Sequence, residues 1–257
     1  MSKRIAHEDL ELLALRLKSF VSDSPHLNFA SINFKSHNDA VTNVDILFQD
    51  KIIEFINDLD PDVNCLSEEA EFWAGEVQDC WIIDPLDGTS NFIQGLRPSA
   101  ISIAKVSGKD VLAALVIDLS NLDVYSAVKA KGARLNFGKM EVMNSNIQLI
   151  GMSTGYLRAG GVIPSNWNVR VIGSQALQLC FVAMGTLSST ISNEAKAWDD
   201  AAGSLIVEES GGFYMHEYMD QSWSMLAISM QSLRSRAITS ALDETNTNEI
   251  LGLKNEE

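Results

Sequence analysis

The chain has 257 residues, of which 46% are hydrophobic and 21% charged, so it can build a sizeable core and shows no bias towards a fibre or a disordered chain. Its net charge of −15 argues against general nucleic-acid binding and against an anionic membrane surface as partners. No apolar run approaches the roughly 18 residues of a membrane-spanning helix. The acidic balance also repels phosphorylated metabolites, unless bound cations reverse the local field.

The N-terminal half is predicted to begin with two amphipathic helices. Apolar residues recur at helical spacing from Leu10 to Val21, which predicts the first helix. A second is expected from about Asn43 to Leu59, and Pro61 ends it because the residue before a proline avoids the helical region. Two further helices are expected near the C-terminal end, at about 174–184 and 199–209.

Short apolar runs bounded by turn residues predict the strands. The connections within 100–128 are short, so we expect this region to be antiparallel. Strands and helices mix without strict alternation, which favours α+β layers over a doubly wound sheet. The expected strands are 80–83, 100–106, 111–117, 124–128 and one near 149–150.

The three cysteines, Cys65, Cys80 and Cys180, are far apart and set among apolar residues. An odd number of such cysteines favours buried, reduced thiols. The sequence that follows Met1 to Arg4 is charged and amphipathic, unlike a signal-peptide core. We therefore expect a cytoplasmic protein.

Carboxylates gather at the ends of predicted elements in three places. Loops at such ends commonly carry function, because a rigid scaffold positions them. The three segments are Ser67-Glu68-Glu69, Asp84 to Ser90 and Trp198 to Gly203.

The second segment has the composition of a metal site. Pro85 stiffens the turn, so Asp84 and Asp87 can converge, with the Leu86 carbonyl between them. Such oxygen clusters suit Mg²⁺, Mn²⁺ or Ca²⁺. A short helix starting near Thr89 would add an anion site, and metal-assisted phosphoryl transfer needs both features. A plain turn is the alternative reading, since Asp, Pro and Gly are common in turns.

Taken together, these segments resemble the inositol monophosphatase family of Mg²⁺-dependent, lithium-sensitive phosphomonoesterases. The stretch from Trp81 to Phe92 is similar to the family's WIIDPIDGTTNF block. The stretch from Trp198 to Gly212 is similar to its WDxAAG…EAGG block. Shorter matches occur in family order, and the resemblance covers roughly residues 5 to 230. The shorter matches are Val41 to Asp45, Ser67 to Glu69 and Gly173-Ser174.

The resemblance implies a site with two or three Mg²⁺ ions, with Mn²⁺ as a substitute. One ion would be held by Glu68, Asp84 and the Leu86 carbonyl. A second would be held by Asp84, Asp87 and Asp199, with Asp84 bridging the two ions. Two-metal chemistry makes an attacking water available near neutral pH and neutralises the charge on the leaving oxygen.

The resemblance also implies the catalytic and phosphate-binding residues. Thr89 would hydrogen-bond Asp45, and this pair would help to activate the attacking water. Glu69 would be a further catalytic residue, near a third and more weakly bound Mg²⁺. Phosphate would be bound by Gly88 and Thr89 amides, and the wider phosphate-binding set would comprise Asp87, Gly88, Thr89, Gly173, Ser174 and Asp199.

Two positions bear on which residue binds the metal and which residue contacts the substrate. Asp200 follows Asp199, and the Trp immediately before Asp199 favours Asp199 as the ligand. Ser192 stands where animal inositol phosphatases place a glutamate that touches the sugar ring. Glu194 or Lys196 is the alternative contact, so preference for inositol is open.

Two other functional classes compete with the phosphatase. The segment from Gly151 to Gly155 matches the G-x-S-x-G elbow of serine esterases, and Asp199 and His216 follow in the required order. The residues from Tyr156 to Pro164 are too short and broken for the helix that an elbow must open. A non-catalytic regulatory protein would be favoured by loss of a ligand carboxylate, and none is lost.

The resemblance implies an α+β fold, a layered α/β/α/β/α sandwich. Its halves would be residues 1–145, with most metal-binding motifs, and 146–257, which complete the active site. We expect a homodimer that hydrolyses a small phosphorylated metabolite, without membrane binding and without general nucleic-acid binding. An inositol monophosphate is the favoured substrate, and related enzymes cleave adenosine 3′,5′-bisphosphate, fructose 1,6-bisphosphate, NADP or histidinol phosphate.

Overall fold

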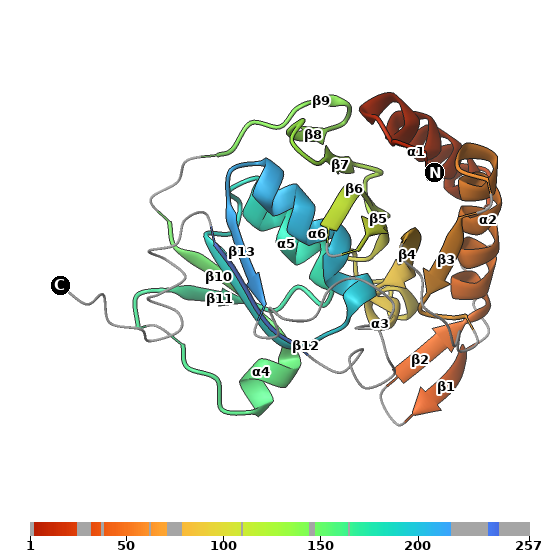
Figure 1. The fold of residues 1–257 in the computed structure, drawn as a ribbon. Coiled ribbons are helices and arrows are strands. Elements are labelled where there is room, and N and C mark those ends of the chain that lie inside the picture. The colour runs from red at the N-terminus through yellow and green to blue at the C-terminus, as the bar shows by residue number, and fades with distance from the viewer. Residues whose placement is uncertain are drawn as a thin grey trace.

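The computed structural model shows helices and sheets stacked in alternating layers (Figure 1). It describes residues 3–24, 32–36, 39–61, 63–70, 79–108, 110–143, 147–163, 165–216 and 236–241. Among these residues, no helix is both long enough and apolar enough to cross a membrane.

The four expected helices are confirmed, and two short helices join them. The expected end of the second helix at Leu59 is also confirmed. The last helix starts slightly earlier than expected, with Lys196 as its N-cap. The helices are α1 (His7–Ser22), α2 (Asn43–Leu59), α3 (Thr89–Ile93), α4 (Thr154–Arg158), α5 (Gln175–Ala183) and α6 (Ala197–Glu209).

A seven-stranded sheet, in the order β3-β4-β5-β6-β7-β8-β9, forms the centre of the molecule. The expected antiparallel pairing across residues 100–128 is confirmed, whereas β3 and β4 run parallel. Its strands are β3 (Asn64–Ser67), β4 (Asp79–Asp87), β5 (Ala100–Ser107), β6 (Asp110–Asp118), β7 (Val124–Val128), β8 (Ala133–Leu135) and β9 (Gly138–Lys139).

A second sheet of five strands has the order β11-β10-β12-β14-β13, and β1 and β2 form a separate antiparallel pair. The sequence predicted only β10 of these strands. The bounds are β1 (Ile32–Ser36), β2 (Asp39–Thr42), β10 (Leu149–Met152), β11 (Asn168–Arg170), β12 (Ser189–Ala195), β13 (Phe213–His216) and β14 (Arg236–Ala241).

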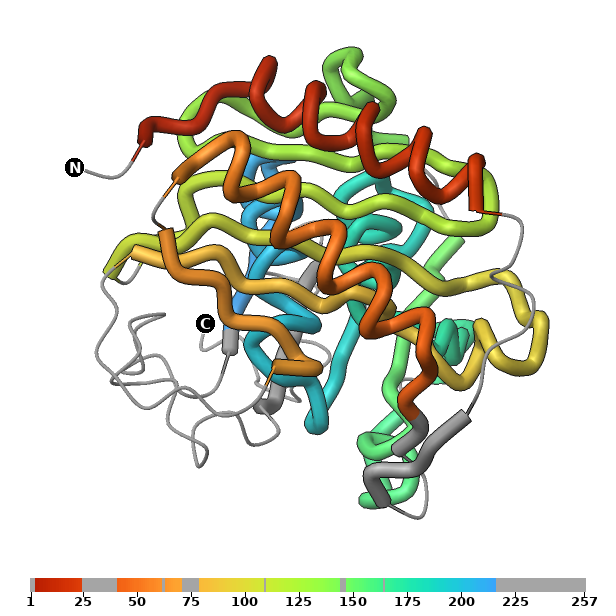
Figure 2. The backbone as a smooth tube through the Cα atoms, turned by 90° about the vertical axis from the view of Figure 1, so that its right-hand side faces the viewer, coloured from red at the N-terminus to blue at the C-terminus, as the bar shows by residue number. Residues whose placement is uncertain are grey.

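The seven-stranded sheet is buried on both faces, which explains why its strands read as continuous apolar runs. In β4, Trp81 and Ile83 pack on the side of α1 and α2, and Figure 2 shows these two helices crossing that face. Cys80 and Ile82 point the other way, into the core shared with α5 and α6. The two-residue period of a strand therefore builds two cores from one segment.

The five-stranded sheet is also covered on both faces. Ile150 and Met152 of β10 pack with Tyr156 and Leu157 of α4. The residue between them, Gly151, faces α5, since a Cβ there would lie 2.7 Å from the Gln178 side chain. The order of layers is therefore helix, sheet, helix, sheet, helix, and the expected α/β/α/β/α sandwich is confirmed.

Strand β4 continues past the point where the sequence predicted its end. The apolar run stops at Asp84, but the strand extends to Asp87. Pairing with β5 shifts in register between Asp84 and Asp87, so Pro85 and Leu86 lie in an irregular stretch. A proline fits such a stretch, because it has no N–H to donate to a regular ladder.

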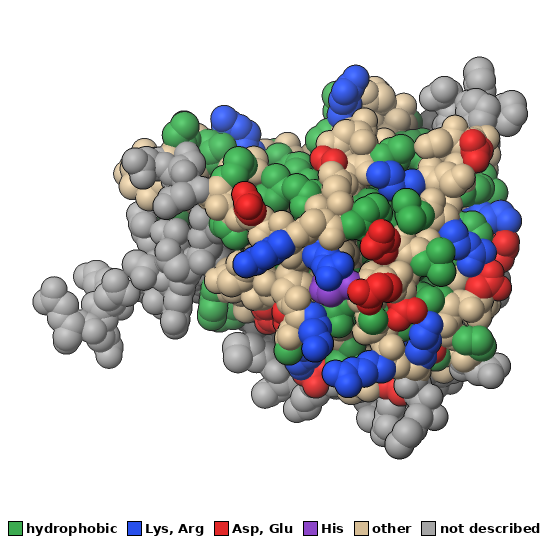
Figure 3. Space-filling model, turned by 90° about the horizontal axis from the view of Figure 1, so that it is seen from above, with side chains coloured by type: hydrophobic (Ala, Val, Ile, Leu, Met, Phe, Trp, Pro, Cys, Tyr) green, Lys and Arg blue, Asp and Glu red, His purple; other side chains and the backbone are tan. Residues whose placement is uncertain are grey.

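Charges of both signs share the face seen from above (Figure 3). Acidic and basic side chains alternate there with hydrophobic ones, so the net charge of −15 is not gathered on this face.

Candidate metal centre

Three carboxylates from distant parts of the chain converge. Ligand oxygens of Glu68, Asp84 and Asp199 all lie within 4.8 Å of one another. Strands β3 and β4 run parallel with Ser67 opposite Ile83, so their ends bring Glu68 beside Asp84. Asp199 comes from the first turn of α6. The adjacent Glu69 is half-buried and is not in this group of three.

The cluster concentrates negative charge in a poorly hydrated place. Burial, followed by the nearby charges of Glu68, Asp87 and Asp199, raises the pKa of Asp84 well above its usual range. Burial and the charges of Glu68 and Asp87 raise the pKa of Asp199 in the same way. A bound divalent cation would remove this repulsion, so the cluster fits a hard cation with oxygen ligands such as Mg²⁺.

The raised pKa values predict the pH dependence of stability without metal. The folded state of the EDTA-treated protein binds more protons than the unfolded state between about pH 4, the ordinary carboxyl pKa, and the raised values. Its free energy of unfolding should therefore increase as pH falls from 7 to 5. Burial lowers the pKa of His7, and this makes the free energy of unfolding decrease as pH falls. The pH slope of the wild type should therefore be compared with that of Asp84→Asn, in which His7 is unchanged. Identical slopes in thermal unfolding of the two proteins would contradict this assignment.

Asp45 and Thr89 are hydrogen-bonded, as the resemblance implied. Thr89 Oγ1 lies 3.2 Å from Asp45 Oδ1 and 2.9 Å from the Leu86 carbonyl oxygen. The other oxygen of Asp45 accepts from the backbone N–H of Thr42 at 2.8 Å, a capping-box contact that starts α2. One carboxylate thus closes a helix end and orients the hydroxyl of Thr89.

Asp199 repeats this arrangement at the start of α6. Its Oδ2 accepts from the backbone N–H of Lys196 at 2.6 Å, which fixes the side chain beside the cluster. The ammonium of Lys196 lies 3.9 Å from Glu68 Oε1. Asp200 is buried and accepts from the Tyr214 hydroxyl at 2.5 Å. The cluster therefore contains Asp199 and not Asp200.

Asp87 is held at the amino end of α5. Its Oδ2 accepts from Ser174 Oγ at 2.6 Å and from the Ala176 N–H at 2.7 Å. Burial raises the pKa of Asp87, and these hydrogen bonds oppose the rise. Asp87 lines the same cleft as Asp199 but lies outside the compact group of three carboxylates.

Gly88 and Gly173 allow two loops to touch. Gly88 has φ of +86°, and a Cβ on it would lie 2.9 Å from the carbonyl oxygens of Gly173 and Pro98. The amide of Asn91 also spans this contact, since its Nδ2 donates to the carbonyls of Pro98 and Ile172 at 2.7 and 2.9 Å. The structure thus brings the predicted phosphate-binding residues of both loops together.

Sequence reasoning missed the role of Asn91 in joining these loops. Its partner Ile172 is 81 residues away, and no local pattern marks such a contact. Glu194, an alternative substrate contact, lines the cleft, whereas Lys196 is not among its lining residues.

Ser153, the serine of the esterase-like motif, caps a helix. The five-residue helix α4 does follow it, although the sequence predicted no helix there. The Oγ atom of Ser153 accepts from the Tyr156 N–H at 3.1 Å. The side chain of His216 lies outside the described side chains, so no triad is defined by this structure.

The fold and the site define a layered sandwich protein with carboxylates that converge at strand and helix ends and could hold a metal ion. The profile of the inositol monophosphatase family matches residues 11–245. The chain is 37% identical over 194 residues to "Nus factor SuhB" of Pasteurella multocida, covering 69% of this chain and 72% of that protein. It is 34% identical to the Escherichia coli K12 protein of that name, covering 72% and 76% of the two chains. The chain belongs to the inositol monophosphatase family.

Solved structures agree on the fold. A staphylococcal inositol monophosphatase-1, soaked with LiCl as an inhibitory complex, superposes with a TM-score of 0.78 at 22% identity, covering 99% of this chain and 97% of that one. An IMPase/NADP phosphatase complexed with Mg²⁺ and phosphate gives 0.75 at 22% identity, covering 96% and 95%. SuhB from Bartonella henselae gives 0.76 at 24% identity, covering 97% and 99%.

Proposed function

We propose that this protein hydrolyses a small phosphate monoester in a Mg²⁺-dependent reaction. The observation that carries the proposal is the convergence of Glu68, Asp84 and Asp199 within 4.8 Å, next to a cleft of about 730 Å³. A cleft of this volume is in the range for small metabolites. Family membership supports the reaction class, and the metal core by itself does not select the substrate.

In this proposal the carboxylates hold the cations, and the surrounding residues orient the reactants. Glu68, Asp84 and the Leu86 carbonyl would bind one Mg²⁺, and Asp84, Asp87 and Asp199 would bind a second. The cations would supply positive charge for the phosphoryl oxygens and the leaving oxygen. A third ion near Glu69 belongs to the same proposal.

The amides of Gly88 and Thr89 would receive phosphate oxygens, with Gly173 and Ser174 closing the other side. The single proton of the Thr89 hydroxyl has two acceptors in reach, Asp45 Oδ1 and the Leu86 carbonyl oxygen, so the hydroxyl oxygen can accept a hydrogen bond from the attacking water. Asp45 would hold this orientation through its two hydrogen-bonded oxygens.

Replacing Thr89 by alanine should lower kcat by about 10²- to 10³-fold, because the residue that orients the water is lost. KM should change by less than about threefold, because the cations and amides still bind phosphate. Thr89→Ser keeps the hydroxyl and should retain most of the activity. A rise in KM with kcat unchanged would make Thr89 a phosphate contact and not a residue that activates water.

The reaction class is tested by phosphate release from a panel of small phosphomonoesters, with Mg²⁺, with EDTA, and with Mg²⁺ plus Li⁺. The panel contains inositol 1-phosphate, adenosine 3′,5′-bisphosphate, fructose 1,6-bisphosphate, NADP and histidinol phosphate. Release that requires Mg²⁺ and is inhibited by Li⁺ is the expected result. No release from a folded protein with Mg²⁺ or Mn²⁺ would contradict the proposal.

We also propose a homodimeric cytoplasmic protein built from halves 1–145 and 146–257. The site draws Asp84 from the first half and Asp199 from the second. Burial raises the pKa of Cys65 to about 11 and that of Cys80 to about 12, as suits unreactive thiols in a reduced compartment. Light scattering coupled to gel filtration tests the dimer, and a monomer mass at micromolar concentration would contradict it.

A further inference from the structure

The cleft beside the metal centre has room for more than a phosphoryl group. Its lining includes Asp87, Ser174 and Asp199, and the part of the lining that belongs to α4 and β12 is called the α4 wall. Its volume of about 730 Å³ exceeds what a phosphate needs, so the α4 wall is available to contact the alcohol part of a bound ester. The side chains on that wall therefore decide which alcohol fits.

Arg158 is the cation on that wall. Thr154 and Arg158 are one helical turn apart on α4, and both line the cleft. The other charged lining residues, Asp87, Glu194 and Asp199, are all acidic. Arginine keeps its charge at any physiological pH and offers five N–H donors in a planar fork that matches a carboxylate or a phosphate.

Within the described part of the chain, Arg158 makes no hydrogen bond, ion pair or ring contact. The acidic residue on the same wall is already engaged, because Glu194 Oε1 accepts from the Gly155 N–H at 2.8 Å. Two other arginines are paired, since Arg16 lies 2.7 Å from Asp58 and Arg170 donates to the Val169 carbonyl at 2.9 Å, and Arg158 is the arginine that lines the cleft. Arg158 is thus a cation at the cleft, and no described residue occupies its donors.

Gln175 supplies a second donor beside the cleft. Gln175 lines the cleft, and its Nε2 is shielded from water without a hydrogen-bond partner among the described residues. Its Oε1 accepts from Gln178, which assigns the amide orientation. A buried donor without an acceptor is destabilising, so a rotation of the Gln175 side chain that brings Nε2 to a ligand oxygen in the cleft would be favoured. Arg158 and Gln175 are both hydrogen-bond donors, so a ligand that binds them needs acceptor oxygens.

We propose that Arg158 binds a second anionic group, a carboxylate or a second phosphate, on the alcohol part of the substrate, with Gln175 as an additional donor. This inference rests on the proposed phosphatase function and refines its substrate class. A neutral polyol such as inositol would leave the guanidinium without an anionic partner, whereas a bisphosphate or a phosphorylated hydroxy acid would pair with it. Ser192 is small and buried, and it stands where animal inositol phosphatases place a glutamate that touches the sugar ring. This position therefore offers no carboxylate to a polyol.

The test compares esters that differ only in the second anion. The pairs are 3-phosphoglycerate against glycerol 3-phosphate, and adenosine 3′,5′-bisphosphate against adenosine 3′-phosphate, each assayed for phosphate release with Mg²⁺. The wild-type kcat/KM should be at least about tenfold higher for the member with the second anion in one pair, as expected for a charge-assisted hydrogen bond. The pair that shows the preference identifies the anion as carboxylate or phosphate.

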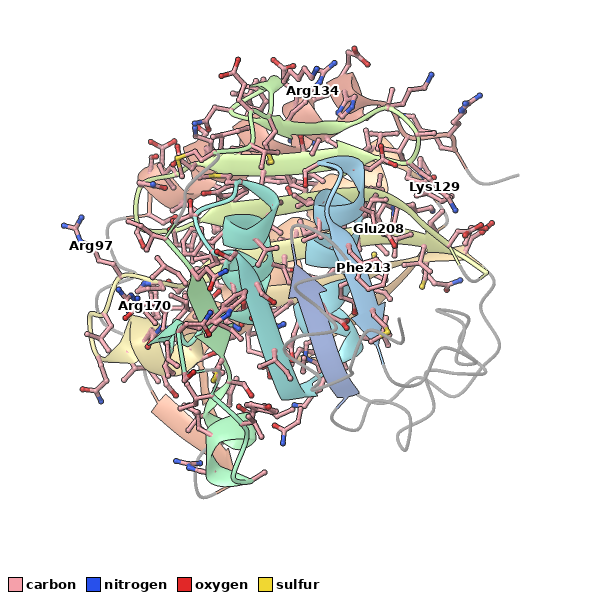
Figure 4. All side chains as sticks on the ribbon, turned by 90° about the vertical axis from the view of Figure 1, so that its left-hand side faces the viewer. Arg97, Lys129, Arg134, Arg170, Glu208 and Phe213 are labelled. Carbon is pink, nitrogen blue, oxygen red and sulfur yellow. The ribbon has the colours of Figure 1, made fainter. Side chains whose placement is uncertain are left out.

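Arg158→Met should lower kcat/KM for the preferred ester by about 10- to 100-fold and change that of its neutral partner by less than about threefold. Arg170→Met is the matched control, because Arg170 is an exposed arginine on β11 outside the cleft lining (Figure 4). It should leave both values unchanged. Equal losses on both members of a pair in Arg158→Met, or no wild-type preference in either pair, would overturn the proposal.

Failure of the phosphatase function would look different. If no ester releases phosphate, isothermal titration with the same pairs still measures binding. Tighter binding of the member with the second anion by at least about tenfold, lost in Arg158→Met, would uphold the anion-binding role without hydrolysis. Equal binding of both members, or no binding of either, would overturn it.

Discussion

Replacing Asp84 by asparagine is expected to reduce phosphate release by at least about 10³-fold, or about 4 kcal/mol in the activation barrier. Asp84 stands at the centre of the carboxylate cluster and would contact both cations. Its Oδ1 accepts from the Leu86 N–H at 3.0 Å, a contact that an asparagine oxygen can also make. The turn should therefore persist while the charge is lost.

The same variant separates metal binding from folding. Without metal, Asp84→Asn should unfold at a higher temperature than the wild type, because it removes a buried charge repelled by Glu68 and Asp199. With Mg²⁺, the wild type should gain stability by mass action, and the variant should gain far less. Thermal unfolding in EDTA and in Mg²⁺ measures both effects.

Asp200→Asn is the matched control for this experiment. It changes the same charge one residue from Asp199, but Asp200 contacts Tyr214 and is not in the cluster. Its stabilisation by Mg²⁺ should equal that of the wild type. If Asp84→Asn kept that stabilisation or its turnover, the cations would not bind where we place them.

Removing Asp60 should cause a large loss of stability. Lys105 is fully buried in the core between the seven-stranded sheet and α2, and its ammonium lies 2.7 Å from Asp60 Oδ2. The Trp81 indole N–H donates to the same oxygen at 3.1 Å. Asp60→Leu leaves that ammonium buried without a counter-charge, so the free energy of unfolding should fall by about 3–5 kcal/mol.

Urea unfolding with a second variant checks the cause. The double variant Asp60→Leu/Lys105→Met removes both charges and should recover most of the loss, because apolar side chains can replace a buried ion pair. The exposed pair Lys129–Asp110, at 2.6 Å, provides the surface control, and Asp110→Asn should cost less than about 1 kcal/mol. A double variant no more stable than Asp60→Leu would show that lost packing, and not an unpaired charge, is responsible.

Local patterns in the sequence were sufficient for the long helices and the central strands. The apolar spacing of α1 and α2 is set by the 3.6-residue period, and both cover one sheet face as that spacing predicts. The strands from β4 to β7 are buried on both sides, so they read as apolar runs. The short strands of the second sheet carry mixed residues, such as Ser189 to Ala195, and their pairing depends on partners far along the chain.

The sequence by itself determined the order of the motifs, because each motif is a short segment of neighbouring residues. Through these motifs it resembles a known family, and that resemblance implied the candidate ligands and the hydrogen bond between Thr89 and Asp45, which are 44 residues apart. The tertiary structure places Asp199 and not Asp200 in the cluster, as the sequence favoured, and only the tertiary structure decided that Asn91 ties two loops together. It also decided that Arg158 lines the cleft with no partner among the described residues. Such facts depend on which face of a helix meets which distant segment, and packing of the whole chain sets that geometry.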